Sequence, residues 1–357
     1  MTGLADDRYL AEILGQPAAF RRAAQAMAAQ DDTLRALAAR GPRGPIVLTG
    51  MGSSYDACLA AAAALGAAGI LAATVETAEL LHVRRPMLGG VGLLVLVSQS
   101  GRSAEAVRLA DGVRGFDARR RPLVLAITNG VATPVAAFAD LVLDTEVGAE
   151  VCPSTITFAG SLVALATVAA LLDGSTVEAA IADVKAAAAM AATAAAELLG
   201  EPEETGTRLA AWLGGRPTIV ALGRGTGLAA AEMIALTLME AAGVAAAALP
   251  TAEFRHGPLE IVGPEVAVIL FALEPSTEAL DRAFAEELAA AGSAVLLVGP
   301  AGTAPPGVAS IDVPGPRGIL APAVSLGPLQ LLARQLAYAR GRRPESFSHA
   351  SKVTTRE

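Results

Sequence analysis

The sequence predicts a doubly wound parallel α/β fold that occurs twice in one chain, as two flavodoxin-like three-layer αβα units. Short apolar runs that end in glycine or serine alternate with helical segments along most of the chain. Such runs are typical of strands buried in a parallel sheet. The same alternation begins again near residue 217, after a long helical stretch. This repetition indicates a second sheet.

The N-terminal part predicts helices followed by the first sheet. The runs LAEIL and FRRAAQAMAAQ place apolar residues at helical spacing, and Pro17 lies between them. After the GPRGP break, the expected strands of the first sheet are 45–50, 70–76, 92–100, 122–129 and 139–145. The helices expected between them include 54–69 and 103–115.

The rest of the chain predicts a helical connection and then the second sheet. Residues 154–212 are expected to be mostly helical. The expected strands are 217–225, 265–274 and 293–300, and the expected helices are 228–243, 276–292 and 328–341. The resulting division is N-terminal helices (1–44), a first α/β unit (45–175), a helical connector (176–213), a second α/β unit (214–340) and a C-terminal tail (341–357).

The composition excludes several classes of protein. Hydrophobic residues make up 53% and charged residues 17% of the chain. Its aliphatic stretches are nevertheless interrupted before the roughly 18 apolar residues that a membrane span needs. With a net charge of −8 and basic runs only at residues 119–121 and 340–343, we expect neither a membrane nor a nucleic-acid partner.

The cysteines and the N-terminus suggest where the protein works. Cys58 and Cys152 lie in apolar runs, and the chain has only three histidines. We expect reduced thiols and no metal site, because zinc-ligand spacing is absent. The N-terminus carries acids early and lacks a basic segment, unlike a secretory signal. The expected location is the cytoplasm.

Hydroxyl-rich turns follow two strands of the first predicted sheet. Ser53 and Ser54 follow the first strand, and the turn SQSGRS at 98–103 follows another. Ligands of such sheets bind at the carboxyl ends of strands, and helix N-termini bind anions. The alternative is that these serines only cap helices. Two such turns in one sheet favour a phosphate site.

A dinucleotide cofactor is not expected. The glycine fingerprint of such sites requires a third glycine five positions after the first. Counting from Gly50 the position holds Tyr55, and counting from Gly223 it holds Leu228. A Walker-type lysine is also missing, so no cofactor is predicted.

Taken together, five motifs resemble one family. They are GMGSSYDA, VSQSGRSAEAV, PSTITF, GRGTGLAAAE and EFRHGPLEIV, and their order and spacing are similar to those of the sugar isomerase (SIS) domain family. The likeness is to the isomerase half of glucosamine-6-phosphate synthase and to stand-alone relatives, among them aminosugar-phosphate deaminases. It covers about residues 45–357. The N-terminal cysteine of the family's glutaminase domain is not matched, since residue 2 is Thr2, so glutamine-dependent ammonia transfer is not expected of this chain alone.

The resemblance implies a role for ten residues. Glu240 matches the general base, His256 the ring-opening histidine, and Lys352 the lysine of a tail that closes over the sugar, offset by one position. The matched substrate- and phosphate-binding residues are Ser53, Ser54, Ser98, Gln99, Ser100, Ser103 and Ser154. We add Arg255, beside His256, as a further substrate-binding cation. The resemblance also implies a homodimer in which His256 is lent across the interface.

The residues also fit this chemistry without the family. Moving a carbonyl between C1 and C2 of a sugar requires ring opening by an acid or base active near pH 7, such as His256. A half-buried carboxylate such as Glu240 suits the proton transfer that follows. The alternatives are a solvent-facing Glu240 and a loop histidine that caps a carbonyl. Pro258 after Gly257 predicts an extended, stiff loop.

Two departures from the family pattern remove positive charge. Thr237 stands where the family has a lysine before the glutamate, and Ile156 stands where relatives have a lysine after Ser-Thr. The predicted function is therefore a phosphosugar isomerase, or an amino-sugar-phosphate isomerase/deaminase, acting on a hexose or hexosamine 6-phosphate through an enediol(amine). The alternative is a non-catalytic protein that binds a sugar phosphate and regulates a partner.

Overall fold

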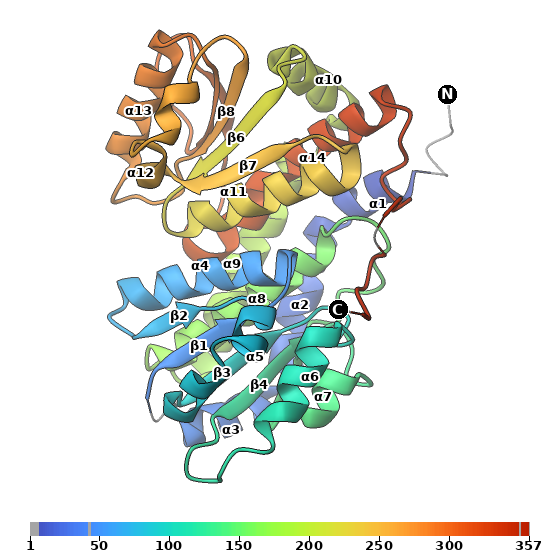
Figure 1. Cartoon of the computed structure of the whole chain (residues 1–357), viewed down its shortest axis with the longest axis vertical. Helices are drawn as coiled ribbons and strands as arrows, with labels where there is room; N and C mark the ends of the chain where they lie inside the picture. Colours follow the sequence, from blue (N-terminus) through green and yellow to red (C-terminus); the bar gives the residue numbers. More distant parts are fainter. Residues whose placement is uncertain (1–6, 42–43, 350, 357) are drawn as a thin grey trace. The chain divides into compact units, whose positions relative to one another are not determined.

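The computed structural model describes residues 7–41, 44–349 and 351–356. These residues divide into two compact units. Among the described residues, unit A comprises 18–41, 44–149, 156–189, 349 and 351–356, and unit B comprises 7–17, 150–155 and 190–348. Figure 1 shows the helices and strands of both units. The five-part division expected from sequence differs from this one in its treatment of the helices and the tail, and it stays a prediction.

Unit A is built on a five-stranded parallel sheet. Its strand order is β2-β1-β3-β4-β5, and every neighbouring pair is parallel. The strands are β1 (Ile46–Thr49), β2 (Ala72–Thr74), β3 (Leu93–Val97), β4 (Leu123–Thr128) and β5 (Leu141–Asp144). Residues of β1 and β3 are buried throughout, as the apolar runs predict.

Helices cover both faces of this sheet (Figure 1). One group consists of α3 (Asp31–Arg40), α4 (Ser53–Ala67) and α8 (Ile156–Leu172), which pack on one another. The other consists of α5 (Thr77–His82), α6 (Ala104–Val113) and α7 (Pro134–Phe138). The short helix η2 (Arg85–Gly90) precedes β3, and α2 (Gln16–Ala29) leads into the unit.

Unit B repeats the same strand order. Its sheet runs β7-β6-β8-β9-β10, and all neighbouring pairs are parallel. The strands are β6 (Thr218–Gly223), β7 (Ala246–Pro250), β8 (Val266–Phe271), β9 (Ala294–Gly299) and β10 (Ala309–Asp312). In each sheet the chain reverses its direction of winding between the first and third strands, which is where α/β folds bind ligands. The predicted doubly wound, flavodoxin-like fold is confirmed.

Unit B is also helical on both faces. Its helices are α1 (Arg8–Leu14), α10 (Pro202–Leu213), α11 (Thr226–Thr237), the π-helical segment η3 (Leu238–Ala242), α12 (Thr251–Phe254), η4 (Pro258–Ile261), α13 (Glu278–Ala290), η5 (Gly318–Leu320) and α14 (Ala321–Ala339). The helices α1, α10 and α11 pack on α14. The boundary between the units falls within α9 (Val177–Leu198).

The helix α9 is the one helix of the described residues that is long and apolar enough, by length and composition alone, to cross a membrane. Core helices of folded domains pass the same test. The two cysteines, Cys58 and Cys152, are buried free thiols, and burial together with the charge of Asp56 raises the pKa of Cys58.

A buried ion-pair network fixes α1 to α14 and α10 within unit B. The Arg334 side chain is 10% exposed, and its Nε donates to Asp7 at 2.7 Å. A second nitrogen lies 2.8 Å from the carboxylate of Glu203. Burial alone would raise the pKa of Asp7, but hydrogen bonds from Leu10 N–H, Arg334 and Tyr338 outweigh it and lower that pKa. The carboxylate is therefore stabilised in its charged form.

We predict that Arg334→Met destabilises the protein by about 3 kcal/mol, because it leaves the Asp7 carboxylate buried without its cation. Urea unfolding followed by circular dichroism measures the loss. The folded pKa of Asp7 lies below its ordinary value of 3.8, so the stabilisation is present above that value and disappears as the pH falls through the folded pKa. The matched control is Arg282→Met, which removes an exposed pair with Glu286 and should cost under about 0.5 kcal/mol. Equal losses for the two variants would contradict the network's role.

Candidate active site

A strand-to-helix turn of the same shape lies at the winding reversal of each sheet. Gly50 directly follows β1 in unit A, and Gly223 is the last residue of β6 in unit B. A Cβ would lie 2.6 Å from the backbone of the following helix at Gly50 and 2.2 Å from it at Gly223. The helix-capping residues Gly52 (φ 52°, ψ −130°) and Gly225 (φ 51°, ψ −124°) share one backbone conformation, which favours glycine. The turns therefore bring backbone N–H groups close to the strand ends in both units.

In unit B this position is filled by the chain's own carboxylate. Glu274 follows β8, and its Oε1 accepts hydrogen bonds from the N–H of Thr226 at 2.8 Å and from the Thr226 hydroxyl at 2.6 Å. Arg224 in the same turn donates to buried Asp281 at 2.8 Å, although burial raises the pKa of Asp281. A carboxylate at a helix N-terminus takes the place that a ligand anion would have.

In unit A the segment after β3, which corresponds to the segment that carries Glu274 after β8, is lined by hydroxyls. Ser98 follows β3, and its buried hydroxyl has no hydrogen-bond partner in the described part of the chain. The turn is fixed by its backbone: the N–H of Gly101 donates to the carbonyl of Ser98, and the N–H of Asn129 donates to that of Gln99. Gly101 has φ +58°, and a Cβ there would lie 2.2 Å from the hydroxyl of Thr133. A tight, preformed turn thus presents an unused hydroxyl.

Helix capping does not account for Ser103. Gly52 is the N-cap of α4 and Ser103 is the N-cap of α6, and neither makes a side-chain capping hydrogen bond. The Ser100 hydroxyl accepts from the N–H of Arg102 at 3.2 Å. Ser53 and Ser54 open α4 beside this turn, since β1 and β3 are parallel neighbours. Unit A therefore gathers five of the predicted serines, together with Gln99, at one edge of its sheet: Ser53, Ser54, Ser98, Ser100 and Ser103.

The C-terminal tail reaches the same turn. The backbone N–H of Ala104, at the start of α6, donates to the carbonyl of Thr354 at 3.1 Å. Lys352 lies two residues before Thr354 and is half-buried. The tail therefore covers part of the α6 N-terminus within unit A, where the sequence predicts that it closes over the sugar.

The predicted base lies in an irregular helical segment of unit B. Glu240 is half-buried within the π-helical turn η3, a feature that occurs often at functional sites. Thr237, at the end of α11, is fully buried and its hydroxyl has no hydrogen-bond partner among the described residues. Because a π-helical turn is wider than an α-helical one, the regular three-residue spacing of an α-helix does not determine how Thr237 and Glu240 face each other.

Tyr9 is a neighbour of Glu240 that the sequence analysis missed. Its side chain is fully buried, and its hydroxyl has no hydrogen-bond partner in the described chain. Burial, followed by the charges of Cys152, Glu240, Glu150 and Glu12, raises the pKa of Tyr9. An aromatic residue in the first helix looks like core packing in the sequence. Only the fold brings it to the carboxylates.

Ser154 lies in the same unit, on a segment held by Glu150. The Glu150 carboxylate accepts a hydrogen bond from the Ser154 hydroxyl at 3.2 Å and another from the N–H of Thr155 at 2.8 Å. Glu12 holds the preceding residues through the N–H groups of Val151 and Cys152. Ile156, which replaces a family lysine, begins α8 and is buried.

The loop that carries His256 differs from its prediction in one respect. Gly257 has φ +134° and ψ −59°, so it is not extended, and Pro258 begins the 3₁₀ turn η4. Such a conformation is open to glycine because it lacks a Cβ. His256 is exposed, and its N–H donates to the carbonyl of Glu253. The extended loop expected from Gly257-Pro258 was wrong.

Arg255 is occupied within unit B. Its guanidinium pairs with Glu287 and lies 4.1 Å from the ring centroid of Phe284. In this arrangement Glu287 compensates its charge. The role of Arg255 in substrate binding stays a prediction, as do the roles of the other ten site residues. The described residues contain no group of three or more His, Cys, Asp or Glu side chains that could hold a metal ion.

Comparison with known proteins identifies the family. The SIS domain model matches residues 42–171 and 214–340, so the chain belongs to the SIS domain family. A curated relative is the glutamine–fructose-6-phosphate aminotransferase [isomerizing] of Aeropyrum pernix, 30% identical over 359 residues, which cover 98% of this chain and 57% of that protein. The chain thus spans little more than half the length of this relative.

Solved structures share the fold across nearly the whole chain. The C-terminal domain of glucosamine-fructose-6-phosphate aminotransferase from Francisella tularensis has a TM-score of 0.82 at 23% identity, covering 94% of this chain and 97% of that one. A glucosamine-6-phosphate deaminase from Thermotoga maritima has a TM-score of 0.76 at 22% identity, covering 97% and 99%. At these identities the likeness establishes the fold.

We predict that Ser98→Ala/Ser100→Ala raises the KM for a sugar phosphate by about thirtyfold, because each hydroxyl contributes about 1 kcal/mol to phosphate binding. Steady-state kinetics or calorimetric titration measures the change. The matched control is Glu274→Gln, which weakens the filled turn of unit B and should lower stability by about 1 kcal/mol while leaving the KM unchanged. A KM that rises in Glu274→Gln and not in the serine variant would reverse the assignment.

Proposed function

We propose that the protein is a phosphosugar isomerase, or an isomerase/deaminase of an amino-sugar phosphate, that acts on a hexose or hexosamine 6-phosphate through an enediol or enediolamine. One observation carries the proposal. The two strand-to-helix turns that share one backbone shape lie before α4 and α11. Glu274, from the segment that follows β8, binds the start of α11, whereas the corresponding segment of unit A, after β3, carries Ser98, whose buried hydroxyl has no partner among the described residues. A phosphate supplies the oxygens that such a turn lacks.

The related proteins support the substrate class. The Aeropyrum pernix and Thermotoga maritima proteins are named for reactions on fructose 6-phosphate and glucosamine 6-phosphate. Both names describe a phosphate on C6 of a six-carbon sugar, with chemistry at the other end of the molecule. A phosphate held at one fixed turn places the distant carbonyl carbons at a reproducible position, which suits one site to several related sugars.

In the proposed reaction, three residues of this chain have a role in the chemistry. His256 transfers the proton that opens the sugar ring, because an imidazole titrates near neutral pH. Glu240 removes a proton from one carbon of the C1–C2 pair and returns it to the other. Lys352, on the tail that contacts the start of α6, supports the charge of the open-chain oxygen. We further propose a homodimer in which exposed His256 serves the partner's site.

The environment of Glu240 suits a general base. The residue is half-buried, and its charge contributes to the raised pKa of fully buried Tyr9. Tyr9 stays neutral in this environment, because burial and the nearby carboxylates raise its pKa. Thr237 provides no amine, so the proposal includes no covalent imine between a residue at this position and the sugar.

We predict that Glu240→Gln lowers kcat by about 10²- to 10⁴-fold, the usual contribution of a positioned base, with little change in KM. The assay supplies hexose and hexosamine 6-phosphates and measures the ketose and the ammonia that form. The control is Glu232→Gln, which removes a half-buried glutamate of α11 whose pKa is also raised by burial and should retain activity within a few-fold.

Activity that survives Glu240→Gln would contradict the assignment of the base. Release of ammonia from glucosamine 6-phosphate identifies a deaminase, and formation of a ketose alone identifies an isomerase. The second candidate function, a sugar-phosphate-binding regulator, draws on the loss of the two family lysines at Thr237 and Ile156. If hexose and hexosamine 6-phosphates raise the melting temperature of the protein but none of them is converted, the result would favour the regulator and contradict the proposed enzymatic function.

A further inference from the structure

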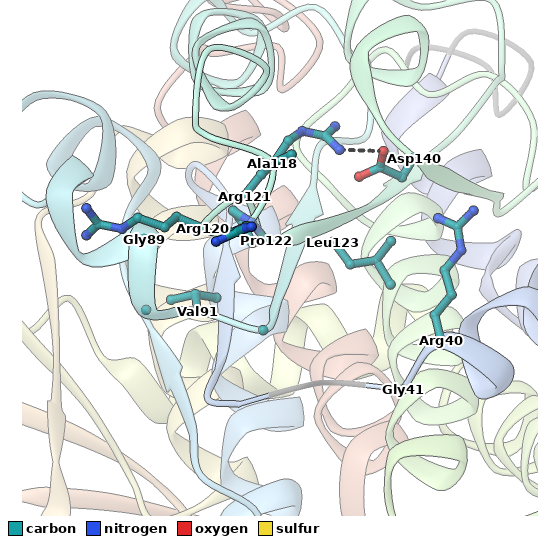
Figure 2. Close-up of a pocket in the computed structure, with 13 residues that line it drawn as sticks. Arg40, Gly41, Gly89, Val91, Ala118, Arg120, Arg121, Pro122, Leu123 and Asp140 are labelled. Carbon is teal, nitrogen blue, oxygen red and sulfur yellow. Dashed lines mark hydrogen bonds and ion pairs between the residues drawn. The ribbon is translucent and has the colours of Figure 1, made fainter.

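Unit A contains a cavity of about 810 Å³, whose lining residues Figure 2 shows. It lies at the edge of the sheet where β3 begins, whereas the serine-rich turn follows the end of β3. It is formed where α3 ends and where β3 and β4 begin. Four arginines and one carboxylate lie among its lining residues: Arg40, Arg119, Arg120, Arg121 and Asp140. The basic run at 119–121, which the proposed reaction does not use, therefore faces a concave space.

A turn held by Asp117 presents the three consecutive arginines. The carbonyl of Asp117 accepts the N–H groups of Arg120 at 2.8 Å and Arg121 at 2.9 Å. Its carboxylate accepts the N–H of Arg119 at 2.9 Å. Because the Asp117 carboxylate accepts the backbone N–H of Arg119, it stabilises the turn, and among the described residues it forms no ion pair with the arginine side chains. The three side chains are left to project from a fixed turn.

Most of the positive charge of this cavity is uncompensated. Arg121 pairs with Asp140 at 2.8 Å, as Figure 2 shows, and the second oxygen of Asp140 accepts the N–H of Val124. In the described part of the chain the guanidinium groups of Arg40, Arg119 and Arg120 form no ion pair. These three side chains line the cavity without a carboxylate partner among the described residues, so an anion that enters it meets uncompensated positive charge.

Glycines form the facing wall and leave the backbone bare. Gly89, Gly90 and Gly92 line the cavity. A Cβ at Gly89 would lie 2.8 Å from a guanidinium nitrogen of Arg120, so that side chain rests directly on the backbone of η2. A Cβ at Gly90 would meet nothing within 4 Å. The cavity is thus open beside Gly90 and supports Arg120 beside Gly89.

We propose that this cavity binds a small phosphorylated molecule that carries at least two phosphate charges. Guanidinium groups bind phosphate oxygens in pairs of parallel hydrogen bonds, and three free ones match a diphosphate better than a single phosphate. The volume lies within the usual range of small-molecule sites, roughly 300–1,000 Å³. A concave site on a chain of net charge −8 suits a compact anion rather than a nucleic acid.

The proposed site is separate from the serine-rich turn. Strand β3 runs between them, with Gly92 before its first residue and Ser98 after its last. Five residues of strand span about 16 Å. One small ligand therefore does not contact both positions, and the two sites can be tested independently.

The test is calorimetric titration of the full chain with inorganic pyrophosphate. We expect saturable binding that weakens as salt rises. Arg119→Gln/Arg120→Gln should raise the Kd at least about tenfold, because it removes two charge-assisted contacts. Gly90→Leu should also weaken binding, because it adds a side chain to the open part of the cavity and keeps every charge. Ser98→Ala/Ser100→Ala should leave the Kd unchanged.

A matched control removes the same charge elsewhere on unit A. Arg35 and Arg114 are exposed and do not line the cavity, so Arg35→Gln/Arg114→Gln should bind pyrophosphate like the unaltered chain. The proposal is overturned if the unaltered chain binds no pyrophosphate, or if the Arg119/Arg120 variant keeps its affinity. It is also overturned if the serine variant loses binding, because the anion then occupies the turn after β3.

Discussion

The fold depends on which groups accept hydrogen bonds from the free backbone N–H groups at the start of each helix that follows a parallel strand. Each such helix leaves several N–H groups without a partner in the helix, and the tight glycine turns bring them to the sheet edge. Unit B provides Glu274 as the acceptor. Unit A provides the carbonyl of Thr354 to Ala104 and leaves the Ser98 hydroxyl without a partner in the described chain. Two copies of one architecture thus have different capacities for an anion.

Sequence patterns predict this difference between the two units only in part. The strands, the glycine turns and the serines after β3 follow from local composition, because buried parallel strands and strand-to-helix turns have strong local signals. Glu274 follows its strand as the serines follow theirs, but its contact with Thr226 joins residues 48 positions apart. Periodicity carries no information on such a contact.

The residues around Glu240 show the same limit more strongly. Tyr9 and Glu12 belong to the first helix, whereas Glu150 and Cys152 precede α8. They share one environment with Glu240 only in the folded unit. The π-helical form of η3 and the conformation of Gly257 were also not predicted, because each depends on packing around a short segment. Resemblance to a family identified Glu240 and His256, and the fold supplied the neighbours of Glu240.

The central claim is that the turn after β3 in unit A holds the phosphate of a sugar phosphate. A crystal structure of the full chain with fructose 6-phosphate tests it most directly. We predict phosphate oxygens within hydrogen-bonding distance of the Ser98 and Ser100 hydroxyls, with Glu274 still bound to Thr226. A phosphate at the start of α11 in place of Glu274, or in the arginine-lined cavity with the serine turn empty, would contradict the claim.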